Sequence, residues 1–307
     1  MREIIVVAGP TAVGKTKYAI ALAKAFEGEL VSCDSMQLYK YMNIGSAKPT
    51  DAERAEAVHH LVDEIDPKEP FSVAKYSKMA KEAIEDIFSR GKTPIVSGGT
   101  GLYLNSLLYD MDFSNAPKDD ELRETLEKEA ELFGPEYIYN KLCEMDPETA
   151  KRIHPNNVKK VIRALEGASS GSSITDFKNC TKKCTDYDAG LIGLTRNREE
   201  LYERINRRVD IMVEEGLFHE VENLLEMGLA EEDISMKGIG YKEIIGFFDG
   251  LYGKEEAIDL IKKNSRHLAK RQLTWFRRYE DMKWFNISNY RDDEDAIEDI
   301  LVWLKKR

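Results

Sequence analysis

One octapeptide near the N-terminus constrains the fold of this chain more than any other segment. It matches the phosphate-binding pattern G-x-x-x-x-G-K-[ST] at every position and consists of Gly9, Pro10, Thr11, Ala12, Val13, Gly14, Lys15 and Thr16. The apolar run at residues 4–8 predicts a buried parallel strand before it, and residues 15–26 predict a helix after it. A strand, a glycine-containing loop and a helix in this order predict an α/β fold with a parallel sheet flanked by helices.

The chemistry of such a loop follows from its backbone. Successive N–H groups curl inward toward phosphate oxygens, and the N-terminus of the following helix adds roughly half a positive charge. Lys15 would then bind the terminal phosphates, and the hydroxyl of Thr16 would hold Mg²⁺. The loop therefore predicts a phosphate-bearing ligand and a magnesium ion, but it does not say which bond is broken.

Size and composition favour a globular protein that works inside the cell. With 307 residues, of which 42% are hydrophobic, the chain is long enough for one large domain or two smaller ones. Its first apolar run is too short for a signal peptide or a membrane span, so we expect a soluble cytoplasmic protein with no membrane partner. Cys180 and Cys184 have no second Cys or His pair at zinc spacing, and we expect free thiols.

Basic residues gather in two segments although the net charge is −11. That net charge alone argues against nucleic acid, because contacts to phosphate require Lys and Arg. Segments 151–165 and 260–279, however, contain no acid; their cations are Lys151, Arg152, Lys159, Lys160, Arg163, Lys262, Lys263, Arg266, Lys270, Arg271, Arg277 and Arg278. Two ordinary solvated helices would explain the pattern, but a polarised surface that steers an anionic partner to one side is the interpretation we favour.

The order of predicted elements indicates a core with an insertion. Predicted strands at 29–33 and 93–97 end at Asp34 and Thr100, and the carboxyl ends of parallel strands face one crevice. We therefore expect Asp34, Thr100 and the phosphate loop to lie together. Residues 115–186 break the alternation, first helical and charged and then rich in Ser, Gly and Thr, and we interpret them as an inserted helical subdomain. The core would comprise residues 1–114 and 187–307, with long helices completing it after a strand at 190–195.

The residues after the second predicted strand suggest what shares the crevice with phosphate. A kinase usually places an acid for Mg²⁺ after four apolar residues, and neither later strand offers a clean example. Asp34 is followed instead by Ser35, Met36 and Gln37. Such a set suits a planar base with hydrogen-bonding edges, while the carboxylate accepts a proton.

These motifs recur together in one known family. Besides the phosphate loop they are Asp34-Ser-Met-Gln-Leu-Tyr39, Ile44-Gly-Ser-Ala-Lys-Pro49, His59-His-Leu-Val-Asp63, Gly98-Gly-Thr-Gly-Leu-Tyr103, His154-Pro-Asn-Asn157, Met236-Lys-Gly-Ile-Gly-Tyr-Lys-Glu243 and Lys270-Arg-Gln-Leu-Thr-Trp-Phe-Arg277. In this order and spacing they resemble the bacterial tRNA dimethylallyltransferases, also called tRNA isopentenyltransferases. The resemblance extends over nearly the whole chain, although the phosphate loop alone is shared by many enzymes.

The resemblance implies a prenyl transfer in which the phosphate loop holds the leaving group. The dimethylallyl group of dimethylallyl diphosphate would move to N6 of the adenosine at position 37 of tRNA, beside the anticodon. Asp34 matches the family's general base, and Thr100 matches a hydroxyl near the reacting centre. Lys15 and Mg²⁺ would neutralise the departing diphosphate. Arg204 and Arg208, one helical turn apart, could face the same diphosphate, with Arg208 in a catalytic role.

The resemblance also implies contacts to the anticodon stem-loop of tRNA. The residues we assign to these contacts are Asp34, Ser35, Met36, Gln37, Arg123, Lys159, Lys160, Val161, Ile162, Arg163, Lys237, Gly238, Ile239, Gly240, Tyr241, Lys242, Lys270 and Arg277. Bases in a single-stranded loop can be splayed out, and the target base can be flipped into a crevice for a few kcal/mol. We expect the protein to act as a monomer.

Three other functions stay open at the level of sequence. An adenylate isopentenyltransferase would share the loop and the acid, but it has no need of the basic segments. A small-molecule kinase would require the missing acid after an apolar strand. A phosphate-loop switch protein would bind nucleotide tightly and form no product. Transfer of label to tRNA, to AMP or to neither distinguishes these functions.

Overall fold

The chain divides into two compact units in the computed structural model, which describes residues 2–111, 120–169, 182–184 and 186–307. The first unit is Met1–Leu108 with Cys184–Arg307, and the second is Tyr109–Lys183. The sequence placed the boundaries at 114/115 and 186/187, a few residues later at each end. Cys180 and most of the Ser-, Gly- and Thr-rich segment lie outside the described residues.

The first unit is built on a six-stranded parallel sheet in the order β3-β2-β4-β1-β5-β6. Its strands are β1 Arg2–Ala8, β2 Gly28–Ser32, β3 His59–His60, β4 Thr93–Gly98, β5 Tyr187–Thr195 and β6 Lys283–Asn286. The predicted α/β fold with a parallel sheet is thereby confirmed, and four of the strands match predicted ones. The short edge strands β3 and β6 had not been predicted.

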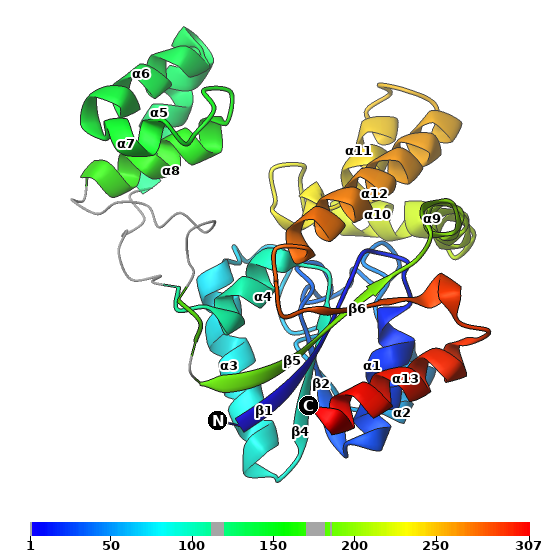
Figure 1. Cartoon of the computed structure of the whole chain (residues 1–307). Helices are drawn as coiled ribbons and strands as arrows, with labels where there is room; N and C mark the ends of the chain where they lie inside the picture. Colours follow the sequence, from blue (N-terminus) through cyan, green and yellow to red (C-terminus); the bar gives the residue numbers. More distant parts are fainter. Residues whose placement is uncertain (1, 112–119, 170–181, 185) are drawn as a thin grey trace. The chain divides into compact units, whose positions relative to one another are not determined.

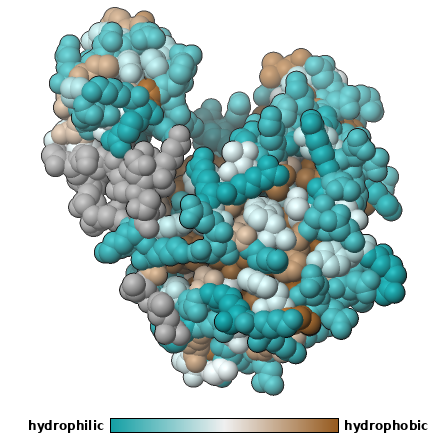
Figure 2. All heavy atoms as spheres, viewed as in Figure 1, coloured by the Kyte–Doolittle hydropathy of each residue, from teal (hydrophilic) through white to brown (hydrophobic). Residues whose placement is uncertain are grey.

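Helices cover both faces of this sheet (Figure 1). On one face lie α3 (Val73–Ser89) and α4 (Gly101–Leu108); on the other lie α1 (Lys15–Ala25), the short α2 (Asp51–Glu56) and α13 (Asp293–Lys306). α13 begins with an acidic run, and Asp292 is its N-cap. Its inner side buries Ala296, Ile300 and Leu304 against the core. Hydrophilic side chains cover most of the face seen in Figure 2.

Four helices gather at the carboxyl end of the sheet (Figure 1). They are α9 (Arg198–Glu214), α10 (Leu217–Glu226), α11 (Tyr241–Phe248) and α12 (Lys254–Phe276). Ligands of open parallel sheets bind at this end, because the loops that follow the strands meet there. Residues of α9 and α12, together with Leu217 at the start of α10, therefore line one side of the candidate site.

The second unit is helical, as the sequence predicted. Its helices are α5 (Asp120–Phe133), α6 (Pro135–Met145), α7 (Pro147–Ala150) and α8 (Val158–Ser169). Their apolar faces share one core that includes Ile138, Leu142 and Leu165. Among the described residues of both units, no helix combines the length and apolarity that crossing a bilayer demands.

A buried carboxylate at the start of β2 gives a test of the fold. Glu29 is 2% exposed and forms ion pairs with Arg90, Lys92 and His60. These hydrogen bonds, above all those from Arg90, hold the pKa of Glu29 well below its usual range. A carboxyl with a lowered folded-state pKa stabilises the fold above its unfolded pKa, and this contribution fades as the pH falls toward the folded value.

We predict that Glu29→Gln lowers the free energy of unfolding by about 3 kcal/mol at pH 7, because Arg90 and Lys92 lose their buried anionic partner. The difference from the unaltered protein should shrink below about pH 4, near the pKa of an unfolded Glu. Urea denaturation at pH 7 and pH 3.5 measures both values. Glu85→Gln, which removes an exposed partner of Arg2, is the control and should have a much smaller effect. Equal effects of the two substitutions would contradict the prediction.

Candidate functional site

A cavity of about 1180 Å³ opens at the carboxyl end of the sheet. The predicted site residues that line it are Thr11, Ala12, Gly14, Lys15, Thr16, Asp34, Ser35, Met36, Gln37, Thr100, Arg208, Ile239 and Gly240. The prediction that the phosphate loop, Asp34 and Thr100 face one crevice is therefore confirmed. The volume exceeds what one small molecule needs, which leaves room for two reacting partners.

The phosphate loop joins β1 to α1 through a backbone that only certain residues tolerate. Gly14 has φ 108° and is the N-cap of α1, a left-handed conformation that glycine adopts without steric cost. Lys15 turns back over the loop, and its Nζ donates to the carbonyls of Gly9 at 3.1 Å and Pro10 at 2.9 Å. The lysine is thus held at the centre of the loop, where phosphate oxygens would lie.

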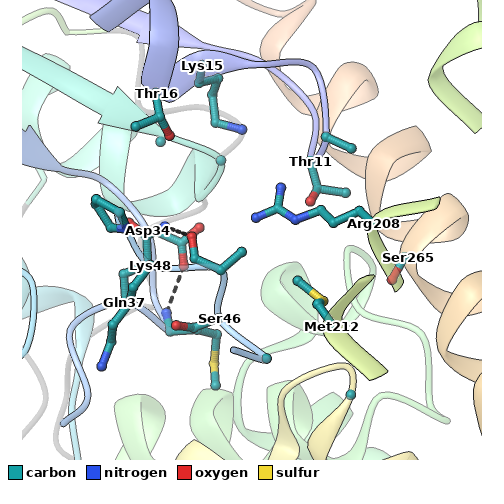
Figure 3. A pocket seen from close by; sticks show the side chains of 18 of the residues that line it. Thr11, Lys15, Thr16, Asp34, Gln37, Ser46, Lys48, Arg208, Met212 and Ser265 are labelled. Atoms are coloured by element: carbon teal, nitrogen blue, oxygen red, sulfur yellow. Dashed lines mark hydrogen bonds between the residues drawn. The ribbon is translucent and has the colours of Figure 1, made fainter. Parts of the chain in front are cut away.

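Two cations face this cavity with little solvent around them. The pKa of Lys15 is lowered to about 8, mainly by burial; the nearby positive charge of Arg208 acts in the same direction, and Asp34 opposes both. Burial also lowers the pKa of Arg208, which extends from α9 into the cavity (Figure 3). Within the described part of the chain, Arg208 makes no hydrogen bond or ion pair. A bound anion would therefore stabilise both cations.

Arg204 contacts the phosphate loop from beside the cavity. The sequence paired it with Arg208 at the diphosphate, but it is not among the residues that line the cavity. Its Nε donates to the carbonyl of Ala12 at 3.0 Å. Arg196, which the sequence analysis missed, donates to the neighbouring carbonyl of Val13 at 3.1 Å. These two arginines hold the backbone of the phosphate loop, whereas Arg208 is among the arginines that line the cavity.

Asp34 and Thr100 are held beside each other by the turn that follows β2. The Oδ1 of Asp34 accepts from the amide of Met36 at 2.9 Å, and the Oγ1 of Thr100 accepts from the amide of Ser35 at 3.0 Å. The amide of Thr100 donates to the carbonyl of Cys33 at 3.1 Å. Oδ2 of Asp34 makes no hydrogen bond with any residue that the structure describes, so one carboxylate oxygen is available for a proton.

Gln272 of α12 connects the two loops, and the sequence analysis assigned it no role. Its Oε1 accepts from the amide of Thr11 at 2.8 Å, and its Nε2 donates to the carbonyl of Gly99 at 3.0 Å. A Cβ on Gly99 would lie 2.4 Å from this amide, and one on Gly101 would lie 2.2 Å from the ring of Trp275. Glycines are therefore needed where α12 packs against the loop after β4. No local sequence signal indicates which helix residue reaches a loop in this way.

In the helical unit, the residues assigned to tRNA divide into two groups. Lys159 and Lys160 are exposed on α8. Val161 and Ile162 are 0% and 2% exposed, so the assignment of their side chains to tRNA is corrected: they form the core of the unit. The reason is helical geometry, since the next residues along α8 turn inward.

Buried acids hold other members of the same set. Arg123 and Arg163 both pair with Glu166, whose side chain is fully buried. In the first unit, Tyr241 is buried and its hydroxyl donates to Glu220, so its side chain is also corrected from tRNA contact to structural support. The cations on either side of it, Lys237 and Lys242, are exposed, as are Lys270 and Arg277 of α12; Gly238 is partly buried against Met36.

We predict that a diphosphate binds in this cavity more weakly as the pH rises above about 8. Below that pH Lys15 is already protonated, but above it the bound anion requires the lysine to take up a proton, which costs up to about tenfold in affinity per pH unit. Calorimetry at pH 7 and pH 9, in buffers of different ionisation enthalpy, should show proton uptake only at the higher pH. Lys15→Arg, which stays charged throughout, is the control. Equal affinity of the unaltered protein at both values would remove Lys15 as the titrating group.

The chain is similar over almost its full length to proteins of known activity. The family model described as IPP transferase matches residues 37–279. A tRNA dimethylallyltransferase of Alkaliphilus oremlandii is 53% identical over 301 residues, which is 98% of this chain and 96% of the relative. One of Clostridioides difficile is 50% identical over 302 residues, covering 98% and 97%.

Solved structures agree. A tRNA isopentenylpyrophosphate transferase of Bacillus halodurans superposes with a TM-score of 0.75 at 42% identity, covering 100% of this chain and 96% of the other. A eukaryotic dimethylallyltransferase, described as acting on tRNA, superposes with a TM-score of 0.83 at 29% identity, covering 100% of this chain and 80% of the other.

Proposed function

Because this chain belongs to the IPP transferase family, we propose that it moves the dimethylallyl group of dimethylallyl diphosphate to N6 of the adenosine at position 37 of tRNA, beside the anticodon. The chain is a transferase that acts on tRNA. The observation that carries the finer proposal is the pairing of Lys15 and Arg208, two poorly solvated cations, with the carboxylate of Asp34 in one cavity.

The cations would bind the diphosphate as a leaving group. In the transfer, the bond between the allylic carbon and the diphosphate oxygen breaks, and a bond forms from the same carbon to N6 of adenine. Negative charge grows on the diphosphate as it departs. Lys15, Arg208 and the amides of the phosphate loop lie where they can stabilise that charge, and in a site with little water they do so strongly.

The residues around Thr16 fit a magnesium ion, which we propose as the cofactor. Mg²⁺ usually binds through one or two protein oxygens together with substrate phosphates and water, rather than through a full set of protein ligands. The Thr16 side chain lines the cavity, and the described residues contain no cluster of three metal-binding side chains. The Thr16 hydroxyl and the diphosphate would hold the ion, which would supply positive charge to the leaving group when bound.

Asp34 would take the proton that N6 loses. Its Oδ1 is held by the Met36 amide while Oδ2 is available, so the carboxylate is oriented before substrate arrives. Thr100 fixes the same turn through the Ser35 amide. Adenine can reach this position only when it is unstacked and flipped out of the anticodon loop.

Exposed cations would bind the RNA backbone around the flipped base. In the first unit they lie on α12 and at its C-cap (Lys270, Arg277), and before and in α11 (Lys237, Lys242); in the second unit they lie on α8 (Lys159, Lys160). An anticodon stem-loop is the part of tRNA we propose for these contacts, because its loop bases are accessible. We propose a monomer as the working form, since residues of one chain line the cavity. We also propose that it works in the cytoplasm.

A transfer assay tests the proposal. Purified protein, Mg²⁺ and labelled dimethylallyl diphosphate are offered unmodified tRNA, the same tRNA with guanosine at position 37, and AMP. Label should enter only the unmodified tRNA and should need Mg²⁺. Label in the guanosine variant would refute the proposed position, and label in AMP would indicate a cytokinin-forming enzyme instead.

We predict that Asp34→Asn lowers the single-turnover rate by about 10² to 10⁴, because an amide cannot accept the N6 proton. Binding of dimethylallyl diphosphate should change little. Rapid-quench measurement with excess enzyme separates the chemical step from product release. Asp51→Asn, which also removes a carboxylate from the cavity wall, is the matched control and should keep nearly full activity. An unchanged rate in Asp34→Asn would exclude this residue as the base.

We also predict that Lys270→Ala combined with Arg277→Ala weakens tRNA binding and reduces its log–log salt slope by about one to two, because each lost phosphate contact releases one counterion fewer. Filter binding between 50 and 300 mM salt gives the slope. Lys305→Ala with Lys306→Ala removes the same charge from the end of α13 and should leave the slope unchanged. If both double variants show the slope of the unaltered protein, the cations of α12 do not contact RNA.

A further inference from the structure

One buried carboxylate outside the cavity binds a segment of its wall. Glu220 of α10 is 9% exposed and accepts four hydrogen bonds. Its Oε2 accepts from the amides of Asn43 and Ile44, both at 2.7 Å. Its Oε1 accepts from the amide of Gly45 at 3.0 Å and from the hydroxyl of Tyr241 at 2.8 Å. Three consecutive amides that converge on one carboxylate fix the path of the backbone between them.

The segment that Glu220 holds forms one side of the cavity. Residues 43–51 line the cavity without interruption. Gln37, whose amide lies on the same side, donates from Nε2 to the carbonyl of Ala47 at 3.0 Å and accepts at Oε1 from Ser32 at 3.0 Å. Figure 3 shows Gln37 and Ser46 on the side of the cavity away from Arg208. The amides bound by Glu220 therefore set the position of a carbonyl that in turn orients Gln37.

Close packing leaves this segment little freedom to move. A Cβ on Gly45 would lie 2.5 Å from the ring of Tyr241, so the backbone at this point lies directly on the ring. Tyr241 is fully buried and is the first residue of α11, next to the exposed Lys242. One carboxylate thus binds both the inner wall of the cavity and the segment 237–242 that we assign to tRNA.

We propose that Glu220 is a positioning residue for the nucleoside side of the reaction, acting through segment 43–47 on Gln37 and the adjoining wall. The proposal rests on the function proposed above. Glu220 does not line the cavity, and none of its hydrogen bonds reaches the phosphate loop. Loss of its carboxylate should disturb the fit of the target base and leave the diphosphate side intact.

The chemistry of the four hydrogen bonds predicts a graded response. Glu220→Gln places an NH₂ group against at least one backbone N–H, a repulsive pairing that must push segment 43–45 away. Displacement of a reacting group by about 1 Å can cost about 10²-fold in rate. Tyr241→Phe removes only the hydroxyl and keeps all three amide contacts, so its effect should be small.

The experiment measures the two substrates separately. For Glu220→Gln we expect the single-turnover rate on saturating tRNA to fall about 10- to 100-fold, with the Kd for dimethylallyl diphosphate unchanged within about twofold. Tyr241→Phe should lose less than about threefold in rate. Glu222→Gln is the matched control, because it changes an exposed carboxylate on the same helix, and it should behave like the unaltered protein.

The number of diphosphate-binding sites per chain distinguishes a loss of folding from a positioning role. Partial unfolding would reduce the number of diphosphate sites per chain together with the rate, whereas a positioning role reduces the rate alone. If Glu220→Gln does not fold, Gly45→Ala displaces the same segment through the Tyr241 ring and should show the same selective loss. A full rate in a folded Glu220→Gln variant, or an equal loss of diphosphate affinity, overturns the proposal. Absence of transfer by the unaltered protein would instead refute the proposed function.

Discussion

The site depends on two positive charges that are buried together near the carboxyl end of β1. Burial lowers the pKa of both Lys15 and Arg208, and the positive charge of Arg208 also lowers the pKa of Lys15. Hydrogen bonds fix the loop around them. Lys15 donates to the carbonyls of Gly9 and Pro10, Arg204 donates to that of Ala12, and Arg196 donates to that of Val13. Asp34 is the carboxylate that acts on both cations, and the site has room for further negative charge beside them. A bound diphosphate would supply it, and the cost of burying two cations would then be offset by their attraction to the anion.

A single helix joins the parts of the site that the sheet alone would leave independent. The inner side of α12 carries Gln272, which bonds to the phosphate loop and to the loop after β4. Its outer side carries Lys270 and Arg277. Because a helix turns through about 100° per residue, neighbours in sequence can serve opposite sides. The basic segment recognised in the sequence is therefore also the part that fixes the distance between the two loops.

The sequence predicted what depends on local pattern. The phosphate loop, four strands of the sheet and the helical insertion follow from apolar periodicity and glycine spacing, and the meeting of Asp34 with the loop follows from parallel topology. The roles of Gln272 and Glu220 could not be predicted, because their partners are backbone groups that only the tertiary fold brings near. The edge strand β3, with two residues, is too short for any periodicity. Val161 and Ile162 were misassigned because the family resemblance was applied to the whole segment 159–163, although only its outward-facing side chains can contact tRNA.

Net charge proved to be a poor guide to the partner, for a structural reason. Four glutamates, Glu29, Glu166, Glu220 and Glu243, are buried and bind cations, amides or hydroxyl groups inside the protein. Each counts toward the total of −11, yet the groups it binds screen it from an approaching polyanion. The exposed cations of α12 and α8, by contrast, face solvent directly. The charge that RNA meets is set by which residues the fold leaves outside, and two acid-free segments in the sequence indicate that better than the sum does.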